Sequence, residues 1–260
     1  MKPIEERGYI IPAFNVGAVD YVDCARTLAK TLLAHHPDAR ICLLTNDSTA
    51  VDPNLFAYTH IVEDIDTVNP YANDYLVFHH TPFRQTIKLE ADMIAASAVD
   101  HWWTLFEQRD VVISQGCRTF YDTPGTSRKY RQIFDNNNLP DVYNAITYWR
   151  LSKTAQDFFN LVKNIFTNWE SYKILLKFPE TIPSTDVVYA MAAKIMGPEQ
   201  ITLPQGLGPQ IVHMKPGMNP YTTLRWTDEL VWETNPMRIQ TVAQYGFVHL
   251  NVKDWHDDQR

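Results

Sequence analysis

Apolar positions in the first part of the chain alternate between short unbroken runs and one longer helical repeat. Residues 9–14 form an apolar run that predicts a buried strand, and residues 41–45 form a second one. Between them, apolar positions recur near helical spacing from Asp20 until His36-Pro37, which predicts a helix. Because neighbouring parallel strands need such a crossover helix, this opening predicts a parallel α/β sheet.

The same criteria predict further elements along the chain. Apolar runs predict strands at residues 59–63, 83–90, 110–114 and 142–149. Amphipathic spacing predicts a helix over 152–168, and Ser184 or Thr185 is a suitable N-cap for another helix with its body at 188–195. The Pro- and Gly-rich segment 203–220 and the short stretch 127–131 are predicted to be loops. Since no repeat or linker interrupts this order, we expect one continuous α/β domain.

The composition narrows the class of protein. The 260 residues are 45% hydrophobic and 20% charged, an ordinary globular balance. Lys and Arg number 23 against 30 Asp and Glu, so the net charge of −7 argues against a strongly basic nucleic-acid module but permits a local basic groove. Three scattered cysteines, Cys24, Cys42 and Cys117, are too few for a disulfide framework. No apolar run reaches the roughly 18 residues of a membrane span, so we expect a cytoplasmic protein.

An acidic pair at the end of the predicted strand 83–90 is the sharpest chemical feature. Side chains two residues apart on an extended chain point to the same side, so Glu90 and Asp92 can address one cation. The carboxyl ends of parallel strands are also where α/β proteins bind ligands. Carboxylate oxygens suit Mg²⁺ or Mn²⁺, which would bridge to the phosphates of a substrate. A pair of solvated turn acids is the alternative interpretation.

A second group of candidate residues lies far downstream, between residues 211 and 217. His213 offers an imidazole to a borderline metal such as Mn²⁺, and Lys215 can neutralise charge that develops on a leaving phosphate. Gly217 permits a close approach of a backbone N–H to a phosphate oxygen. A histidine that packs in a loop is the alternative for His213, but its combination with the upstream acidic pair favours a metal site.

Five blocks of sequence, taken in order, resemble the glycogenin-like, family-eight glycosyltransferases. They are residues 9–46, similar to the nucleotide-binding first half; 81–93, similar to the strand with the Asp-x-Asp motif; 139–146, similar to the Asn-containing turn at the sugar; Thr185-Asp186, similar to the acidic helix start; and 213–217, similar to the His-x-Lys-Pro motif. The chain departs from the family pattern at three places. Glu90 replaces the usual first Asp, Asn144-Ala145 replaces Asn-Ser-Gly, and Gly217 stands where Trp is common.

The resemblance implies a fold and an activity. The implied fold is an α/β, GT-A-like nucleotide-sugar-binding fold in which a central, mostly parallel mixed sheet is flanked by helices. It would form a single domain over residues 1–260, with a nucleotide-binding half at 1–125 and a sugar- and acceptor-binding half with a C-terminal elaboration at 126–260. The implied reaction moves a sugar from a nucleotide-sugar, expected to be a UDP-sugar, to an acceptor hydroxyl with retention at the anomeric carbon. Mn²⁺ or Mg²⁺ is the expected cofactor.

The resemblance also implies a role for each candidate residue. The metal ligands would be Asp92 and His213, with Glu90 beside them. The residues around base, ribose and phosphate would be Phe14, Asn15, Tyr21, Glu90, Lys215 and Gly217. Core packing is the alternative for Tyr21. The residues that orient donor sugar and acceptor would be Asn144 and Asp186. Lys215 and the metal would offset charge on the departing diphosphate.

The acceptor is suggested by a basic segment. Arg128, Lys129 and Arg131 flank Tyr130, so the cations could meet DNA phosphates while the ring stacks on a base. A solvated charged surface is the alternative. The chain also resembles phage-encoded transferases that glycosylate 5-hydroxymethylcytosine, which implies hydroxymethylated DNA as acceptor, base flipping and the host cytoplasm as location. A transferase that extends a cell-surface saccharide and an inactive nucleotide-sugar-binding protein are the two alternatives.

Overall fold

The computed structural model describes most of the first 204 residues and shorter segments beyond them. The described residues are 3–116, 128–179, 181–204, 207–208, 211–214, 218–221, 231–234, 239–241 and 246–250. Of residues 128–130 and of the short segments between 211 and 241, the backbone alone is described. Lys215, Gly217 and Cys117 lie outside the described residues.

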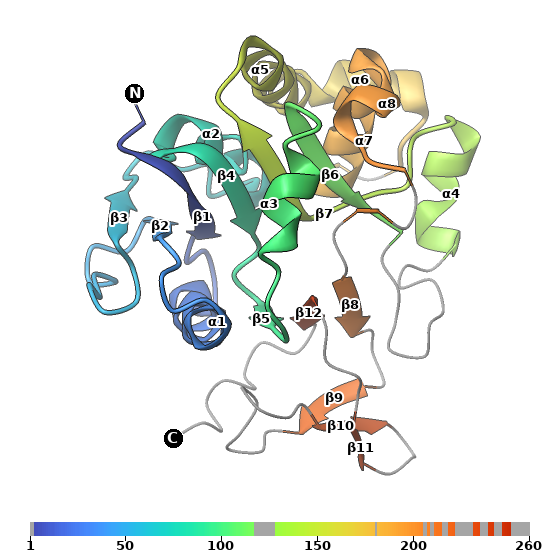
Figure 1. Cartoon of the computed structure of the whole chain (residues 1–260). Coiled ribbons are helices and arrows are strands. Elements are labelled where there is room, and N and C mark those ends of the chain that lie inside the picture. The colour runs from blue at the N-terminus through green and yellow to red at the C-terminus, as the bar shows by residue number, and fades with distance from the viewer. Residues whose placement is uncertain are drawn as a thin grey trace.

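A six-stranded sheet forms the centre of the molecule (Figure 1). Its strands, in spatial order, are β3 (Tyr58–Ile61), β2 (Ile41–Thr45), β1 (Glu5–Ala13), β4 (Phe83–Leu89), β7 (Val142–Arg150) and β6 (Val111–Gln115). The first four strands are parallel to one another, and β7 runs antiparallel to both of its neighbours. The sheet is therefore mixed and mostly parallel, which confirms the α/β prediction.

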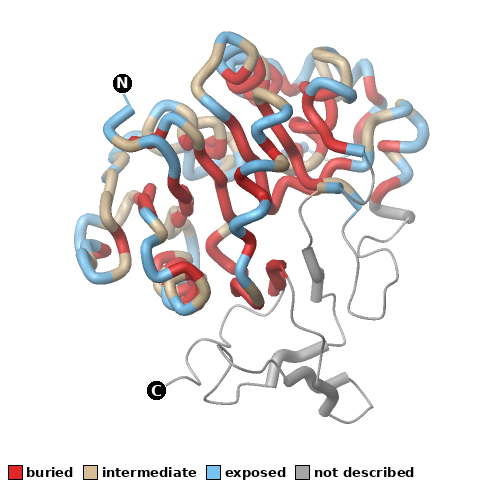
Figure 2. Tube along the Cα trace, in the orientation of Figure 1, coloured by how far each residue is buried: buried red, intermediate tan, exposed pale blue. Residues whose placement is uncertain are grey.

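Helices cover both faces of this sheet, and Figure 2 shows that the buried residues gather in the layers between them. The face with Ile11, Leu43 and Ile87 packs against α1 (Tyr21–His35) and α3 (His101–Phe106). The opposite face, with Ile10 and Leu44, packs against α5 (Lys153–Thr167) and α7 (Thr185–Met196). The remaining helical segments are α2 (Leu76–His80), α4 (Arg128–Asn136), α6 (Trp169–Leu176), α8 (Pro198–Ile201) and the 3₁₀ turn η1 (Pro70–Asn73). Alternation of side chains along β1 supplies both cores, as expected for a buried strand.

Local sequence signals explain where the main helices begin. The Asp20 carboxylate accepts hydrogen bonds from the backbone N–H groups of Val22 and Asp23, and so caps α1. Ser184 caps α7 by accepting from the N–H of Val187 at 3.4 Å. These two helix starts were predicted, and each places a polar turn near the carboxyl-terminal edge of the sheet.

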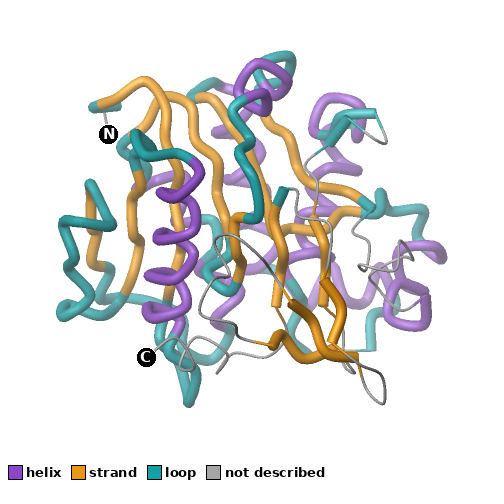
Figure 3. Tube along the Cα trace, turned by 60° about the horizontal axis from the view of Figure 1, so that its bottom comes forward, coloured by secondary structure: helices purple, strands orange, loops and turns teal. Residues whose placement is uncertain are grey.

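Two small sheets lie beside the central one. Strand β12 (Phe247–Leu250) pairs antiparallel with β5 (Met93–Ala95) and parallel with β8 (Ile211–Met214). A second sheet joins β9 (Met218–Tyr221), β10 (Val231–Thr234) and β11 (Ile239–Thr241). The prediction of loops over 203–220 is therefore wrong at β8 and β9, where strand pairing overrides the local Pro and Gly signals. Figure 3 shows the central strands running side by side behind α1. Among the described helices, none is both long and apolar enough to cross a membrane.

Candidate functional site

Two carboxylates and an imidazole meet at the carboxyl end of β4. Glu90 and Asp92 follow the last residue of the strand, and His249 comes from β12. His249 Nε2 lies 3.3 Å from Glu90 Oε2 and 3.0 Å from Asp92 Oδ1. The candidate ligand atoms of all three residues lie within 4.8 Å of one another. The acidic pair converges as predicted, but Asp92 lies in a turn rather than on an extended chain.

Strand pairing explains how a histidine so late in the chain reaches this point. In β12, His249 pairs with Met93 of β5, the residue that follows Asp92. The backbone N–H of Leu250 donates to the carbonyl of Asp92 at 3.0 Å, which fixes the end of β12 against the acidic turn. On the other side of its ring, His249 Nδ1 is hydrogen bonded to the Tyr143 hydroxyl.

The sequence pattern did not predict His249 as a ligand. The prediction placed the imidazole at His213, whose backbone pairs in register with His249 on the neighbouring strand β8. The side chain of His213 lies outside the described part of the chain, so its role stays a prediction. The available signal for His249 was a single polar residue inside the apolar run Phe247–Leu250, which by itself does not distinguish a ligand from a packed histidine.

The donor set fits a divalent cation. Carboxylate oxygens and one neutral imidazole nitrogen are ligands that Mn²⁺ accepts, and oxygen ligands also suit Mg²⁺. Burial raises the pKa of Glu90, and the nearby charges of His249 and Lys88 only partly oppose this effect.

A buried network of charges lies beside this cluster, around Asn144 of β7. Lys88 is fully buried, and its ammonium lies 2.7 Å from Asp74 Oδ1 while donating to the carbonyl of Asn144 at 3.1 Å. The Asn144 amide donates to Asp74 at 3.1 Å and accepts from the Thr147 hydroxyl at 2.7 Å. The hydroxyl of Tyr189 also donates to Asp74. Asn144 is thus wholly engaged within the protein.

Asp186, at the start of α7, is held by the same network. Its Oδ1 accepts from the backbone N–H of Asn144 at 2.8 Å, and its Oδ2 accepts from Arg131 Nη2 at 3.3 Å. Burial raises the pKa of Asp186, and the Arg131 guanidinium opposes the increase. The carboxylate keeps 14% of its surface exposed, so lone pairs remain for a ligand hydroxyl.

Two predictions that involve Arg131 are wrong. The stretch 127–131, predicted as a loop, contains the first turn of α4. The Arg131 side chain is 1% exposed and also donates to the carbonyl of Val142 at 2.7 Å, so it cannot contact a DNA backbone at the surface. Arg131 is buried because it pairs with Asp186, which is 55 residues away in sequence. The side chains of Arg128, Lys129 and Tyr130 lie outside the part of the chain that the structure describes.

The predicted nucleotide-binding residues lie where β1 ends. The Asn15 side chain accepts from the N–H of Tyr21 at 2.7 Å and donates to Asp20 at 3.0 Å, so it holds the turn into α1. Phe14 packs partly buried against the core on the α5 side. Tyr21 packs partly buried against the core on the α1 side, and burial raises the pKa of its hydroxyl.

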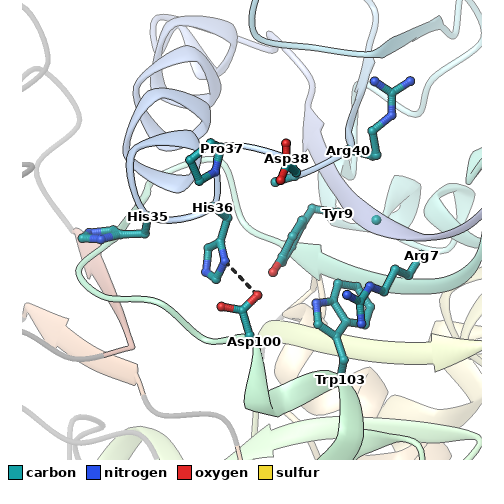
Figure 4. Close-up of a pocket in the computed structure, with 11 residues that line it drawn as sticks. Arg7, Tyr9, His35, His36, Pro37, Asp38, Arg40, Asp100 and Trp103 are labelled. Carbon is teal, nitrogen blue, oxygen red and sulfur yellow. Dashed lines mark ion pairs between the residues drawn. The ribbon is translucent and has the colours of Figure 1, made fainter.

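One described pocket lies at the opposite end of β1 (Figure 4). It has a volume of about 350 Å³ and is lined by the segment Arg7–Tyr9, the end of α1 and the start of α3. Its buried imidazole, His36, accepts at Nε2 from the N–H of Val99 at 3.0 Å and faces Asp100 with Nδ1 at 3.2 Å. These three groups satisfy one another, and the pocket is separate from the acidic cluster.

Comparison with known proteins identifies the fold. No protein-family model matches the sequence, and no curated protein sequence matches it. The crystal structure of mouse xyloside xylosyltransferase 1 is similar with a TM-score of 0.54 at 10% identity, covering 96% of this chain and 98% of that one. The galactosyltransferase LgtC has a TM-score of 0.47 at 13% sequence identity, covering 71% of this chain and 70% of that one. The glycosyltransferase GlyE of Streptococcus pneumoniae has a TM-score of 0.45 at 13% identity, covering 76% of this chain and 45% of that one. The agreement with the xylosyltransferase over nearly the whole of both chains shows that this chain has the GT-A fold of glycosyltransferases.

Proposed function

We propose that this protein is a metal-dependent glycosyltransferase that moves a sugar from a nucleotide-sugar, expected to be a UDP-sugar, to an acceptor hydroxyl. The observation that carries the proposal is the convergence of Glu90, Asp92 and His249 at the carboxyl end of β4, in a fold shared with a xylosyltransferase. That edge of an α/β sheet is where ligands bind.

The three converging residues would hold Mn²⁺ or Mg²⁺, which when bound would offset the negative charge of the departing diphosphate. Asp186 would accept hydrogen bonds from sugar hydroxyls, because both of its oxygens are fixed by Asn144 and Arg131 while part of the group stays exposed. Asn144 acts through its backbone N–H on Asp186 rather than by touching the sugar. Lys215 is proposed to stabilise the leaving group on the strength of the sequence alone.

We further propose that the reaction retains the anomeric configuration, and we consider two classes of acceptor. Hydroxymethylated DNA is the acceptor predicted from sequence, but the burial of Arg131 removes one of the three cations that supported it. A saccharide acceptor is therefore tested in the same experiment.

The test is release of nucleoside diphosphate from a panel of nucleotide-sugars, with Mn²⁺ or with a chelator. We expect turnover with Mn²⁺, loss of turnover in chelator, and loss in Asp92→Asn with folding intact. Asp100→Asn is the matched control, since its carboxylate is 74% exposed at the opposite end of β1, and it should behave as the parent. Turnover that survives in chelator or in Asp92→Asn would contradict metal dependence.

The acceptor is then identified by mass analysis of nucleosides and of saccharides after incubation with the active donor. A mass increase on hydroxymethylcytosine supports the DNA acceptor, and an extended saccharide supports the alternative. The anomeric configuration of the product decides between retention and inversion. Binding of a nucleotide-sugar without turnover under any condition would favour an inactive binding protein.

A further inference from the structure

The Tyr143 hydroxyl makes a contact that packing alone does not require. Tyr143 lies in β7 and is 7% exposed, with its ring in the core on the α1 side of the sheet. Its hydroxyl is hydrogen bonded to Nδ1 of His249, with the two ring centroids 5.7 Å apart. The Ser114 hydroxyl donates to the Tyr143 carbonyl, which fixes the backbone from which this ring projects.

The contact leaves the other imidazole nitrogen facing the acidic pair. Nε2 of His249 lies 3.0 Å from Asp92 Oδ1 and 3.3 Å from Glu90 Oε2. A histidine that binds a cation through one ring nitrogen carries its proton on the other, and a fixed acceptor for that N–H sets the orientation of the ring. The phenol oxygen of Tyr143 can accept this hydrogen bond.

We propose that Tyr143 is a positioning residue that holds the His249 ring with Nε2 directed at a cation bound by Glu90 and Asp92. This inference rests on the proposed function, because it assigns a role within the same metal site. Two neighbouring residues of β7 would then serve the two faces of the sheet, since successive side chains of a strand point to opposite faces. Tyr143 reaches His249 on one face of the sheet, and Asn144 reaches Asp74 on the other.

Substitution of the hydroxyl alone separates positioning from packing. In Tyr143→Phe the ring still fills its place in the core, and the acceptor for His249 Nδ1 is lost. We expect Mn²⁺ affinity to fall about 10- to 100-fold, the usual effect of removing such a partner of a metal-bound histidine. Electron paramagnetic resonance of the free ion during Mn²⁺ titration measures the affinity without any substrate.

Tyr148→Phe is the matched control. Tyr148 lies on the same strand and is fully buried, and its hydroxyl donates to Gln85 at 3.1 Å, away from the acidic cluster. Its Mn²⁺ affinity should stay within about twofold of the parent. A second comparison uses His249→Gln: if Tyr143 acts through His249, Tyr143→Phe should weaken Mn²⁺ binding no further in that background.

Three outcomes would overturn the proposal, and they are distinguishable. Equal Mn²⁺ affinity of the parent and Tyr143→Phe shows that the hydroxyl does not position the ligand, while the proposed metal site stands. An equal loss with and without His249 shows that Tyr143 acts by another route. Failure of the parent itself to bind Mn²⁺ removes the metal site from the proposed function and this role of Tyr143 with it.

Discussion

Replacement of Lys88 by Met should strongly destabilise the protein. The Lys88 side chain is fully buried, lies 2.7 Å from Asp74, and donates to the carbonyl of Asn144 at 3.1 Å. Methionine preserves most of the volume but removes the charge, which leaves the Asp74 carboxylate, 10% exposed, without its cation. Removing one partner of a buried ion pair typically costs about 3–5 kcal/mol.

A double variant tests the origin of that loss. Lys88→Met combined with Asp74→Asn removes both charges, so the uncompensated buried charge disappears. What remains is the lost donor to the Asn144 carbonyl, and an unsatisfied buried acceptor costs about 1–3 kcal/mol. The double variant should therefore be more stable than Lys88→Met alone, although it carries an additional substitution.

Urea unfolding, with the free energy extrapolated to water at constant slope, measures both variants. Lys153→Met is the control, because its partner Asp157 lies one turn away on α5 and the Lys153 side chain is 77% exposed; that loss should stay within about 0.5 kcal/mol. A loss of less than about 1 kcal/mol in Lys88→Met, or a double variant no more stable than the single one, would show that the uncompensated charge of Asp74 is not what destabilises the protein.

Two further predictions concern Ser184 and Lys215. Ser184→Ala should lower the free energy of unfolding by about 1 kcal/mol, because the hydroxyl caps the helix that carries Asp186; urea unfolding measures it, and an unchanged midpoint would show that the cap contributes nothing. Lys215→Ala should lower kcat by about two orders of magnitude or more with little change in KM, since its charge would act on the leaving diphosphate. Steady-state kinetics with the active donor measures both constants, and a raised KM at constant kcat would make Lys215 a binding residue only.

The sequence predicted the central sheet well because its signals are local. The apolar run before Glu90 and the helical spacing that begins at Asp20 are signals of short range, and the strand and the helix that they predicted are confirmed. Because Glu90 and Asp92 come directly after this run, the sequence also predicted that the acidic pair lies at the edge of the sheet.

The missing parts depend on partners that are distant in sequence. His249 reaches the acidic pair through pairing of β12 with β5, and no periodicity within residues 247–250 encodes that partner. Arg131 has the sequence appearance of a surface cation, and its burial becomes visible only when Asp186 is brought beside it. Strand pairing also converts part of the Pro- and Gly-rich segment into strands, because β8 pairs with β12 and β9 pairs with β10.

The most direct test of the proposed metal site is anomalous X-ray scattering from crystals of the protein grown with Mn²⁺ and a nucleoside diphosphate. We expect one strong manganese peak in contact with Asp92, Glu90 and His249 Nε2, and its loss in crystals of Asp92→Asn. A manganese peak elsewhere, or no peak at this edge of the sheet at saturating Mn²⁺, would contradict the proposed metal site.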